Sequence, residues 1–269
     1  NGKIDQIRMF NTVLNATQIS DLYNEAASDN NTLNFPAGAG CIAAYTLNET
    51  ANDLSGNYNG TASNITYAKP GYLGGNVNGS IPSQVVANPN GGFSIVTYTA
   101  TGTTGTVGHG LSTPPELIMG KTTNQAYDWV VYHASLGATK QMVLNDTRAE
   151  QSSTFMANTA PTATVFTAGS GNNLNYANGN TIIAYCFTSI PGYSRVSSYV
   201  GTGGALDIYC GFQPSYVMIK RTDNTGYWVI VDSKRASGDS RLYANVNNAE
   251  DTGQGESFYS NGFRPRNST

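Results

Sequence analysis

The side chains most able to bind a metal or to act as a nucleophile are the histidines His109 and His133 and the cysteines Cys41, Cys186 and Cys210. An odd number of cysteines without a CxxC pair fits neither a disulfide scaffold nor a zinc site. We expect buried or incidental thiols, as in a protein that is assembled in a reducing cytoplasm and can later work outside the cell. His109 and Cys210 could form a ligand pair, but a zinc site needs further ligands and none is evident. The sequence therefore predicts no metal site and a structural role for His109 near a turn.

Two short motifs approach known catalytic loops without completing them. GYSRV, around Ser194, lacks the second glycine of a nucleophile elbow, so Ser194 is not expected to be a hydrolase nucleophile. GTGGAL, at 201–206, lacks both the GxGxxG spacing and the GK[ST] ending of phosphate-binding loops. Neither motif predicts catalysis, and no cofactor is expected.

Carboxylate pairs are the remaining route to catalysis, because a glycosidase needs two carboxylates about 5–9 Å apart. The acids that could serve are scattered over turns and strand edges, and they are Glu116, Asp128, Asp207 and Asp232. The sequence singles out no pair, and we expect solvated surface acids. The chain is therefore predicted not to be an enzyme.

The composition excludes several further classes of function. Charged residues make up 12% of the chain, against about 25% in an average soluble protein, and the net charge is −3. Without clustered Lys and Arg we expect no nucleic-acid partner. No apolar run approaches the ~20 residues of a membrane span, so no membrane insertion is expected. The sequons that begin at Asn48 and Asn64 are attributed to the Asn- and Thr-rich composition, because they matter only in a eukaryotic secretory protein.

Most of the chain consists of short apolar runs separated by Gly and Asn, which indicates an all-β fold of the sandwich or barrel type. One short helix is expected near the N-terminus, where Asn15 and Gln18 form a variant of the capping box. Ile19, Leu22 and Tyr23 follow on one helical stripe.

An internal repeat is visible in the second part of the chain. PELIMGKTTNQAYDWVV, from Pro115, matches PSYVMIKRTDNTGYWVI, from Pro214, at a constant offset that also relates Trp129 to Trp228. MVLNDTRAE then matches LYANVNNAE after a one-residue slip, and VFTAGS loosely matches GFRPRNS. His109 corresponds to Cys210. One supersecondary plan is therefore used twice.

The repeat predicts how the core is built. Two halves with equivalent apolar faces would most simply bury them against each other as a sandwich, with Trp129 and Trp228 as matched core residues. The first copy ends in the apolar strand TIIAYCF, which has no counterpart before Thr269. We therefore expect the natural chain to continue with such a strand.

The opening residues resemble a known module. IDQIRMFNTVLNATQISDLYNE resembles the C-terminal strand and helix of laminin G-like, concanavalin-type jelly rolls, and AAYTLNETANDLSGNYNGTASNITY resembles their N-terminal signature. The resemblance implies that a preceding jelly roll ends within this chain. Such jelly rolls often hold a rim calcium, to which Asp5 or Asp53 could contribute. A complete site needs six to eight oxygens, so we expect Asp53 to cap a turn instead.

Residues 92–269 resemble a duplicated β domain of large structural proteins from marine bacteriophages, especially cyanophages. The residues that carry this resemblance include GFSIVTYTATGT, VGHGLSTPPELI, TIIAYCF, PGYSRVSSYVGTG, GFQPSYVMIKRTD and WVIVDSKR. The predicted organisation is a jelly-roll end at 1–26, a linker at 27–40, an abbreviated jelly-roll start at 41–67, a second linker at 68–91, β repeat 1 at 92–190 and β repeat 2, truncated before its last strand, at 191–269.

The resemblance implies a virion structural protein of the tail-fibre or appendage kind. We expect a structural and adhesive segment at the virion surface, which binds host-surface glycans by multivalent weak contacts. Its expected partners are other copies of itself, in a homo-oligomer such as a trimer, and other virion proteins. The alternatives are a polysaccharide-degrading tailspike enzyme, and a capsid decoration or cell-surface adhesin built from the same modules.

Overall fold

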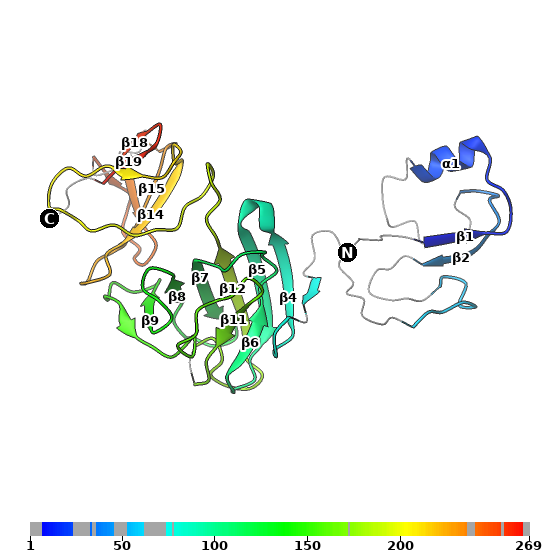
Figure 1. The fold of residues 1–269 in the computed structure, drawn as a ribbon, viewed down its shortest axis with the longest axis horizontal. Helices are drawn as coiled ribbons and strands as arrows, with labels where there is room; N and C mark the ends of the chain where they lie inside the picture. The colour runs from blue at the N-terminus through cyan, green and yellow to red at the C-terminus, as the bar shows by residue number, and fades with distance from the viewer. Residues whose placement is uncertain are drawn as a thin grey trace. The chain divides into compact units, whose positions relative to one another are not determined.

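The computed structural model describes residues 7–23, 33, 36–45, 53–61, 74–76, 78–171, 173–235, 240–253 and 256–265. It divides the chain into two compact units, Asn1–Gly75 and Asn76–Thr269. Strands dominate, and α1 (Ala16–Tyr23) is the single α-helix of the described ranges (Figure 1). The predicted all-β class is therefore confirmed.

In the first unit, a strand pair joins the two segments that resemble jelly-roll ends. β1 (Ile7–Phe10) runs antiparallel to β2 (Cys41–Tyr45), because a lone strand would leave its backbone groups unpaired. Asn11 N donates to Gly40 O over 3.0 Å, so the end of the predicted linker 27–40 packs against the turn that follows β1. The end and start signatures are thus neighbours in one two-stranded sheet.

The helix α1 begins with the predicted cap. Gln18 N donates to Asn15 Oδ1 over 2.9 Å, and Asn15 N donates to Gln18 Oε1 over 3.0 Å, which confirms the reciprocal capping box. Of the residues on the expected stripe, Ile19 is 56% exposed and Leu22 is half-buried. No helix in the described part of the chain has the length and apolar character needed to cross a bilayer.

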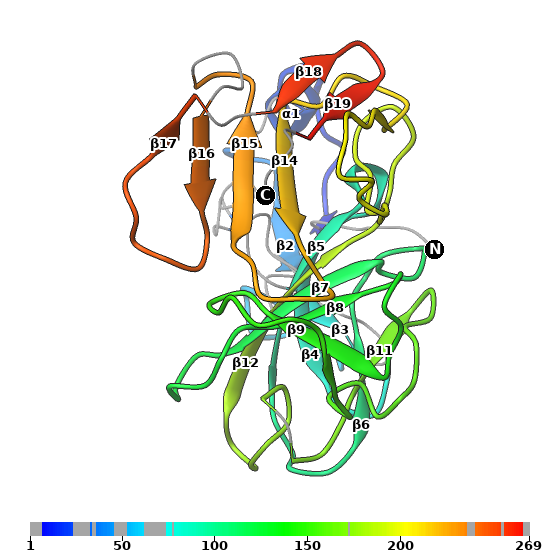
Figure 2. The ribbon, with the colours of Figure 1, turned by 90° about the vertical axis from the view of Figure 1, so that its left-hand side faces the viewer.

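The second unit contains an eight-stranded sheet in the order β10-β9-β8-β7-β12-β5-β4-β3 and a two-stranded sheet, β11-β6 (Figure 2). The strands of the larger sheet are β3 (Gly74–Asn76), β4 (Ser83–Asn88), β5 (Phe93–Thr99), β7 (Leu117–Thr122), β8 (Val130–His133), β9 (Lys140–Val143), β10 (Gln151–Ser152) and β12 (Thr181–Phe187). The smaller sheet consists of β6 (Gly105–Gly108) and β11 (Val165–Ala168).

The core of repeat 1 lies between these two sheets. Alternate residues of β5, β7 and β12 face inward, as a strand period of two requires, and Val96, Ile118 and Ile182 are 0% exposed. They belong to one cluster with Val107 and Phe166 of the smaller sheet. Repeat 1 and the strands β3 and β4 that precede it therefore close a two-layer sandwich without any strand of repeat 2.

The predicted linker 68–91 is wrong over its last part. β4 pairs with β5 along its whole length, and the 3-10 helix η1 (Pro89–Gly91) follows it. Pro82 precedes the strand and Pro89 begins η1, so neither proline removes a bond from the ladder. Because Pro82 and Pro89 flank β4, the sequence of this paired strand has the composition of a linker.

Repeat 2 reproduces the ladder of repeat 1. The order β14-β15-β16-β17 follows the order β7-β8-β9-β10, and Tyr216 faces Asp232 just as Leu117 faces His133. Other matching pairs are Val131–Met142 with Ile230–Leu242, Lys140–Ser152 with Ser240–Thr252, and Val107–Phe166 with Ile208–Phe263. The strands are β13 (Ile208–Tyr209), β14 (Tyr216–Lys220), β15 (Trp228–Asp232), β16 (Ser240–Tyr243), β17 (Asp251–Thr252), β18 (Ser257–Tyr259) and β19 (Gly262–Arg264). The internal repeat is confirmed at the level of strand register.

Two strands of repeat 1, β5 and β12, have no counterpart strand among the described residues of repeat 2. The segment that matches β5 contributes one isolated bridge, between Ser194 and Ile190. In repeat 1 the two strands pair with each other, so either one alone would lose half of its ladder bonds. In repeat 1, β12 also pairs with the second edge of β7. The described part of repeat 2 has no strand that corresponds to β12, so β14 pairs with β15 alone.

The repeats meet through Trp228. It forms a second core cluster with Val131 and Met142 of repeat 1, and its Nε1 donates to Val143 O over 2.8 Å. Met119 and Met218, which occupy matching positions, both pack against this cluster, so corresponding faces of the two repeats do meet, as expected. The fully buried core of repeat 1 lies on the opposite side of its sheet. Repeat 1 is already closed on its inner side, so repeat 2 packs on another part of it.

Candidate functional site

His109 is held in the core of repeat 1. It is 0% exposed, its Nδ1 accepts from Leu111 N over 3.1 Å, and its Nε2 lies 3.0 Å from Thr162 O. These contacts select the neutral ring with the proton on Nε2, and burial lowers the pKa of His109. Both ring nitrogens are engaged, so the geometry is that of a structural histidine.

The three cysteines are free thiols. Cys186 is buried on β12, and burial raises its pKa to about 12, which keeps it a thiol at neutral pH. Cys210 is half-buried, and burial also raises its pKa. Among the described residues, no three His, Cys, Asp or Glu side chains lie together as metal ligands would.

The four acids singled out in the sequence each have a partner of their own. Glu116 Oε2 accepts from Ser189 N over 2.6 Å. Asp207 is held by Arg264 through two bonds of 2.7 and 3.0 Å, and Asp232 Oδ2 accepts from Arg235 Nε over 2.7 Å. Asp128 Oδ1 accepts from Asn145 Nδ2 over 2.9 Å. These contacts tie loops to strands, and each of the four acids is partly exposed at the surface while it pairs with a neighbour.

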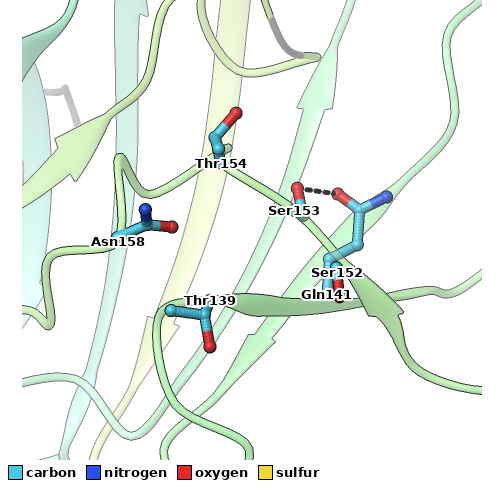
Figure 3. Close-up of a pocket in the computed structure, with 6 residues that line it drawn as sticks. All are labelled: Thr139, Gln141, Ser152, Ser153, Thr154 and Asn158. Carbon is cyan, nitrogen blue, oxygen red and sulfur yellow. Dashed lines mark hydrogen bonds between the residues drawn. The ribbon is translucent and has the colours of Figure 1, made fainter.

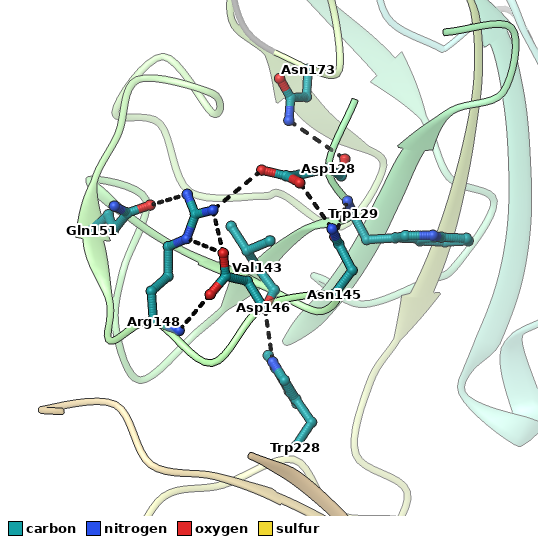
Figure 4. A network of polar contacts seen from close by, with 9 residues as sticks. All are labelled: Asp128, Trp129, Val143, Asn145, Asp146, Arg148, Gln151, Asn173 and Trp228. Carbon is teal, nitrogen blue, oxygen red and sulfur yellow. Dashed lines mark hydrogen bonds and ion pairs between the residues drawn. The ribbon is translucent and has the colours of Figure 1, made fainter. Parts of the chain in front are cut away.

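One carboxylate pair is present that the sequence did not single out. Asp128 and Asp146 both contact the Arg148 guanidinium, and Asp128 lies 3.8 Å from it (Figure 4). Hydrogen bonds from the Arg148 side chain and backbone hold the pKa of Asp146 below its usual range. A glycosidase acid needs the opposite shift, a raised pKa. This geometry is that of an ion-pair network that braces the 144–150 loop.

The remaining residues singled out in the sequence either make hydrogen bonds within turns or lie outside the described residues. Asp53 is buried in a turn, where its Oδ1 accepts from Ala44 N over 2.8 Å, in agreement with the expected turn cap. Burial raises the pKa of Asp53, but hydrogen bonds from Ser55 and from backbone groups outweigh it and leave the pKa lowered. Ser194 Oγ donates to Thr188 O over 3.3 Å. Asp5, Asn48 and Asn64 lie outside the described residues.

The matched tryptophans occupy unequal environments. Asn145 Oδ1 accepts from Trp129 N over 2.8 Å, and Asn245 Oδ1 accepts from Trp228 N over 2.9 Å. Trp228 is 3% exposed against repeat 1, whereas Trp129 is half-buried and stacks on Tyr185, with ring centroids 6.2 Å apart. The prediction of two core tryptophans is therefore confirmed for Trp228 and wrong for Trp129.

A polar hollow in repeat 1 is the candidate site for a ligand. It has a volume of about 540 Å³ and lies where β9, β10 and the turn after β10 meet (Figure 3). Its lining consists entirely of uncharged polar residues, which are Thr139, Gln141, Ser152, Ser153, Thr154 and Asn158. Hydroxyl and amide groups of this kind both donate and accept hydrogen bonds.

One contact within the hollow determines which side-chain groups of Gln141 remain available. Ser153 Oγ donates to Gln141 Oε1 over 2.8 Å, which fixes the Gln141 side chain and leaves its Nε2 as a donor. Within the described structure, no protein hydrogen bond occupies the Asn158 amide. The hollow therefore presents donors and acceptors to a neutral, hydroxyl-rich ligand.

The backbone beside the hollow is strained. Ala157 and Asn158 have φ values of 47° and 56°, the two non-glycine residues with positive φ in the described ranges. Such conformations cost about 1–3 kcal/mol each and often occur at ligand sites. In the same turn Ala157 N donates to Thr154 O over 2.7 Å, which holds Asn158 at the rim.

The sequence pattern did not predict the hollow. The run QSST, at 151–154, places four neighbouring polar side chains at the end of a strand, but TTNQ, at 122–125, does the same, so the run alone does not single out a site. The matching run in repeat 2 begins with Asp251 and does not preserve it. The other lining residues come from separate segments, so no local pattern joins them.

Comparison with known proteins gives a family and no activity. A family model described as "Domain of unknown function (DUF7483)" matches residues 1–269. No curated protein and no solved structure matches the chain.

Proposed function

The chain belongs to the DUF7483 family, and we propose that it is a structural and adhesive segment of a bacteriophage tail fibre or surface appendage. In this proposal it lies at the virion surface, binds host-surface glycans by many weak contacts and works beside other copies of itself and other virion proteins. The observation that carries the adhesive role is the uncharged hydroxyl- and amide-lined hollow of repeat 1. Glycans present many hydroxyl groups, and such groups pair well with Ser, Thr, Asn and Gln side chains.

Exposed tyrosines support the same role. Tyr176, Tyr193, Tyr209, Tyr216 and Tyr227 are each between 45% and 69% exposed. Tyrosine offers a flat apolar ring and a hydroxyl group on a stiff side chain, which is why binding surfaces are rich in it.

A shallow open hollow binds weakly by itself, and repetition along a fibre compensates. Linked weak sites raise the overall affinity by a factor of about 10²–10⁴ without any new contact. The ion pairs at Asp128, Asp146, Asp207 and Asp232 support the structural part of the proposal, because they connect loops to strands. Hydrogen bonds from their arginine partners lower the pKa values of Asp146, Asp207 and Asp232.

The test is binding of the chain, displayed in many copies on beads, to host envelope polysaccharide. The variant Thr139→Val/Asn158→Gly removes one hydroxyl and one amide from the hollow, and glycine tolerates the positive φ at position 158. We expect at least tenfold weaker retention for this variant. The matched control Thr202→Val/Asn248→Gly changes exposed residues of repeat 2 and should retain wild-type binding.

Three outcomes decide the question. Loss of binding in the hollow variant alone supports the proposal. Equal binding by both variants and the wild type contradicts the assignment of the hollow. New reducing ends in the polysaccharide during the incubation would contradict the adhesive role and favour a degrading enzyme.

A further inference from the structure

The outer face of the large sheet in repeat 1 is apolar, and repeat 2 packs against one end of it. A row of facing residues crosses the sheet from β4 to β9 and consists of Val86, Ile95, Tyr185, Met119, Val131 and Met142. The last three of these contact the cluster around Trp228. At the other end Val86 is 39% exposed, and Ile95 and Tyr185 are half-buried. An accessible apolar strip over β4, β5 and β12 therefore continues beyond the contact with repeat 2.

Three aromatic rings follow one another on this strip. The centroids of the Phe93 and Tyr185 rings are 6.4 Å apart, with 7° between their planes, and those of Tyr185 and Trp129 are 6.2 Å apart, with 18° between their planes. All three side chains are half-buried. On the opposite side of β12, Ile182 and Cys186 are 0% exposed. The nearly parallel rings therefore belong to a surface that is partly open, and not to the core of the sandwich.

Uncharged polar side chains border the strip on β4. Gln84, Val86 and Asn88 are exposed and alternate with less exposed residues, so they share the outer face of the strand. Asn88 Oδ1 accepts from Gly91 N over 3.0 Å, which fixes the side chain and leaves its Nδ2 as a donor. Gln84 faces Thr97 across the ladder, which adds a hydroxyl group to this border. The strip thus combines aromatic surface with neutral hydrogen-bonding groups.

We propose that this strip is a second glycan-binding subsite, which takes a neutral, extended, β-1,4-linked chain. The CH groups of a pyranose ring form apolar faces that pack on aromatic rings, and its hydroxyl groups pair with amides at the border. The inference rests on the proposed function, because it adds a site for the same class of ligand.

The width of the strip favours a glycan over a protein partner. Val86 is its most exposed apolar side chain, and the amides of Gln84 and Asn88 lie on either side of it along β4. A stable protein interface buries about 1,200–2,000 Å² and has a broad apolar centre. A narrow row of rings with a neutral polar border matches a single sugar chain better.

The direct test follows the indole N–H signals of the two tryptophans in an NMR titration of the isotope-labelled full chain. The probes are cellohexaose, mannohexaose and xylohexaose, which are neutral β-1,4-linked hexasaccharides. Trp129 stacks at one end of the ring row, whereas Trp228 is 3% exposed and its Nε1 donates to Val143 O. A ligand on the strip should therefore shift the Trp129 signal, and the Trp228 signal is an internal control.

We expect at least one probe to shift the Trp129 signal to saturation. Tyr185→Thr removes a ring and should weaken this binding at least tenfold, whereas Tyr185→Phe keeps the ring and should change it less than threefold. The matched control Ile95→Thr removes apolar surface but no ring from the residue that faces Tyr185, and it should also change binding less than threefold. An unchanged Trp228 signal in each variant shows that the packing between the repeats is intact.

The two glycan sites can fail separately. The hollow variant Thr139→Val/Asn158→Gly should leave the Trp129 titration unchanged. If no hexasaccharide shifts the Trp129 signal while the wild type is retained on polysaccharide beads, the strip assignment is wrong and the proposed function stands. If Trp129 titrates but the wild type is not retained on the beads, the strip binds sugar and the proposed function is wrong.

Two further results would overturn the proposal. One is an equal loss of binding in Ile95→Thr and Tyr185→Thr, because binding would then depend on apolar area and not on a ring. The other is a dimer of the full chain in sedimentation velocity that Tyr185→Thr abolishes, which would make a second copy the occupant of the strip.

Discussion

The two repeats share strand order and register, yet only repeat 1 closes a core of its own. On its inner face Ile182, Ala184 and Cys186 of β12 are 0% exposed. In the described part of repeat 2, the buried apolar residues are Trp228, Val231 and Phe263, and Trp228 is covered by repeat 1. Register is thus preserved where burial is not. Pairing depends on the backbone and the local pattern, whereas burial depends on which further strands are present.

The tryptophans show the same difference on a smaller scale. Each backbone N–H is held by the matching asparagine, Asn145 or Asn245. Trp129 then stacks on Tyr185 of β12. The described residues of repeat 2 contain no strand that corresponds to β12, and Trp228 packs against Val131 and Met142 of repeat 1 instead. The same asparagine–tryptophan hydrogen bond in both repeats therefore leaves the two tryptophan rings to pack against different partners.

The largest expected effect separates the two cores. Phe166 and Phe263 occupy matching positions, but Phe166 is 0% exposed inside the main cluster, whereas Phe263 is 6% exposed and lies outside both clusters. We expect Phe166→Ala to lower the free energy of unfolding by about 4 kcal/mol and Phe263→Ala by about 2 kcal/mol. Urea unfolding of both variants measures this, and equal losses would contradict the difference between the cores.

The next effect concerns a charged pair that only repeat 2 has. Arg241 NH2 lies 2.8 Å from Glu256 Oε1, with side chains 10% and 2% exposed, where repeat 1 has Gln141 and Met156. Arg241→Ala should cost about 3 kcal/mol, because it removes this ion pair from a buried carboxylate. The double variant Arg241→Gln/Glu256→Met installs the residues of repeat 1 and should cost less than the single variant. A double-mutant cycle in urea checks this, and a larger loss in the double variant would be the contrary result.

A smaller effect should distinguish the tryptophans. Trp228→Phe leaves Val143 O without its donor and opens space between the repeats, which should cost about 2 kcal/mol. Trp129→Phe keeps a ring that can stack on Tyr185 and should cost about 1 kcal/mol or less. Thermal and urea unfolding of both variants provide the measurement. Equal losses would mean that the two residues are equivalent after all.

The smallest effect is a pH dependence that belongs to repeat 1. Burial lowers the pKa of His109, so the unfolded chain binds its proton more readily than the folded chain. Stability should therefore fall as the pH drops below about 6.5, the ordinary value for histidine. His109→Gln should flatten the dependence between pH 7.5 and 5. His133, whose pKa burial also lowers, should account for part of what remains, and an unchanged slope in the variant would contradict this role.

Local patterns predicted the features that depend on neighbouring residues. The capping box needs only Asn15 and Gln18, and the strand ladder of the repeats follows from constant sequence offsets. The strand β4 was missed, because Pro82 and Pro89 give its flanks the composition of a linker. The hollow was missed because Thr139, Ser152 and Asn158 become neighbours only when three segments fold together.

The sequence alone determined that the chain is all-β and that one supersecondary plan is used twice. The tertiary structure decided which of two equivalent side chains is buried, which strand edge is left unpaired, and that β1 pairs with β2. The physical reason is that strand formation depends on the alternation of apolar and polar residues along a short segment, which the sequence shows directly. Burial is instead a property of surfaces brought together from distant parts of the chain.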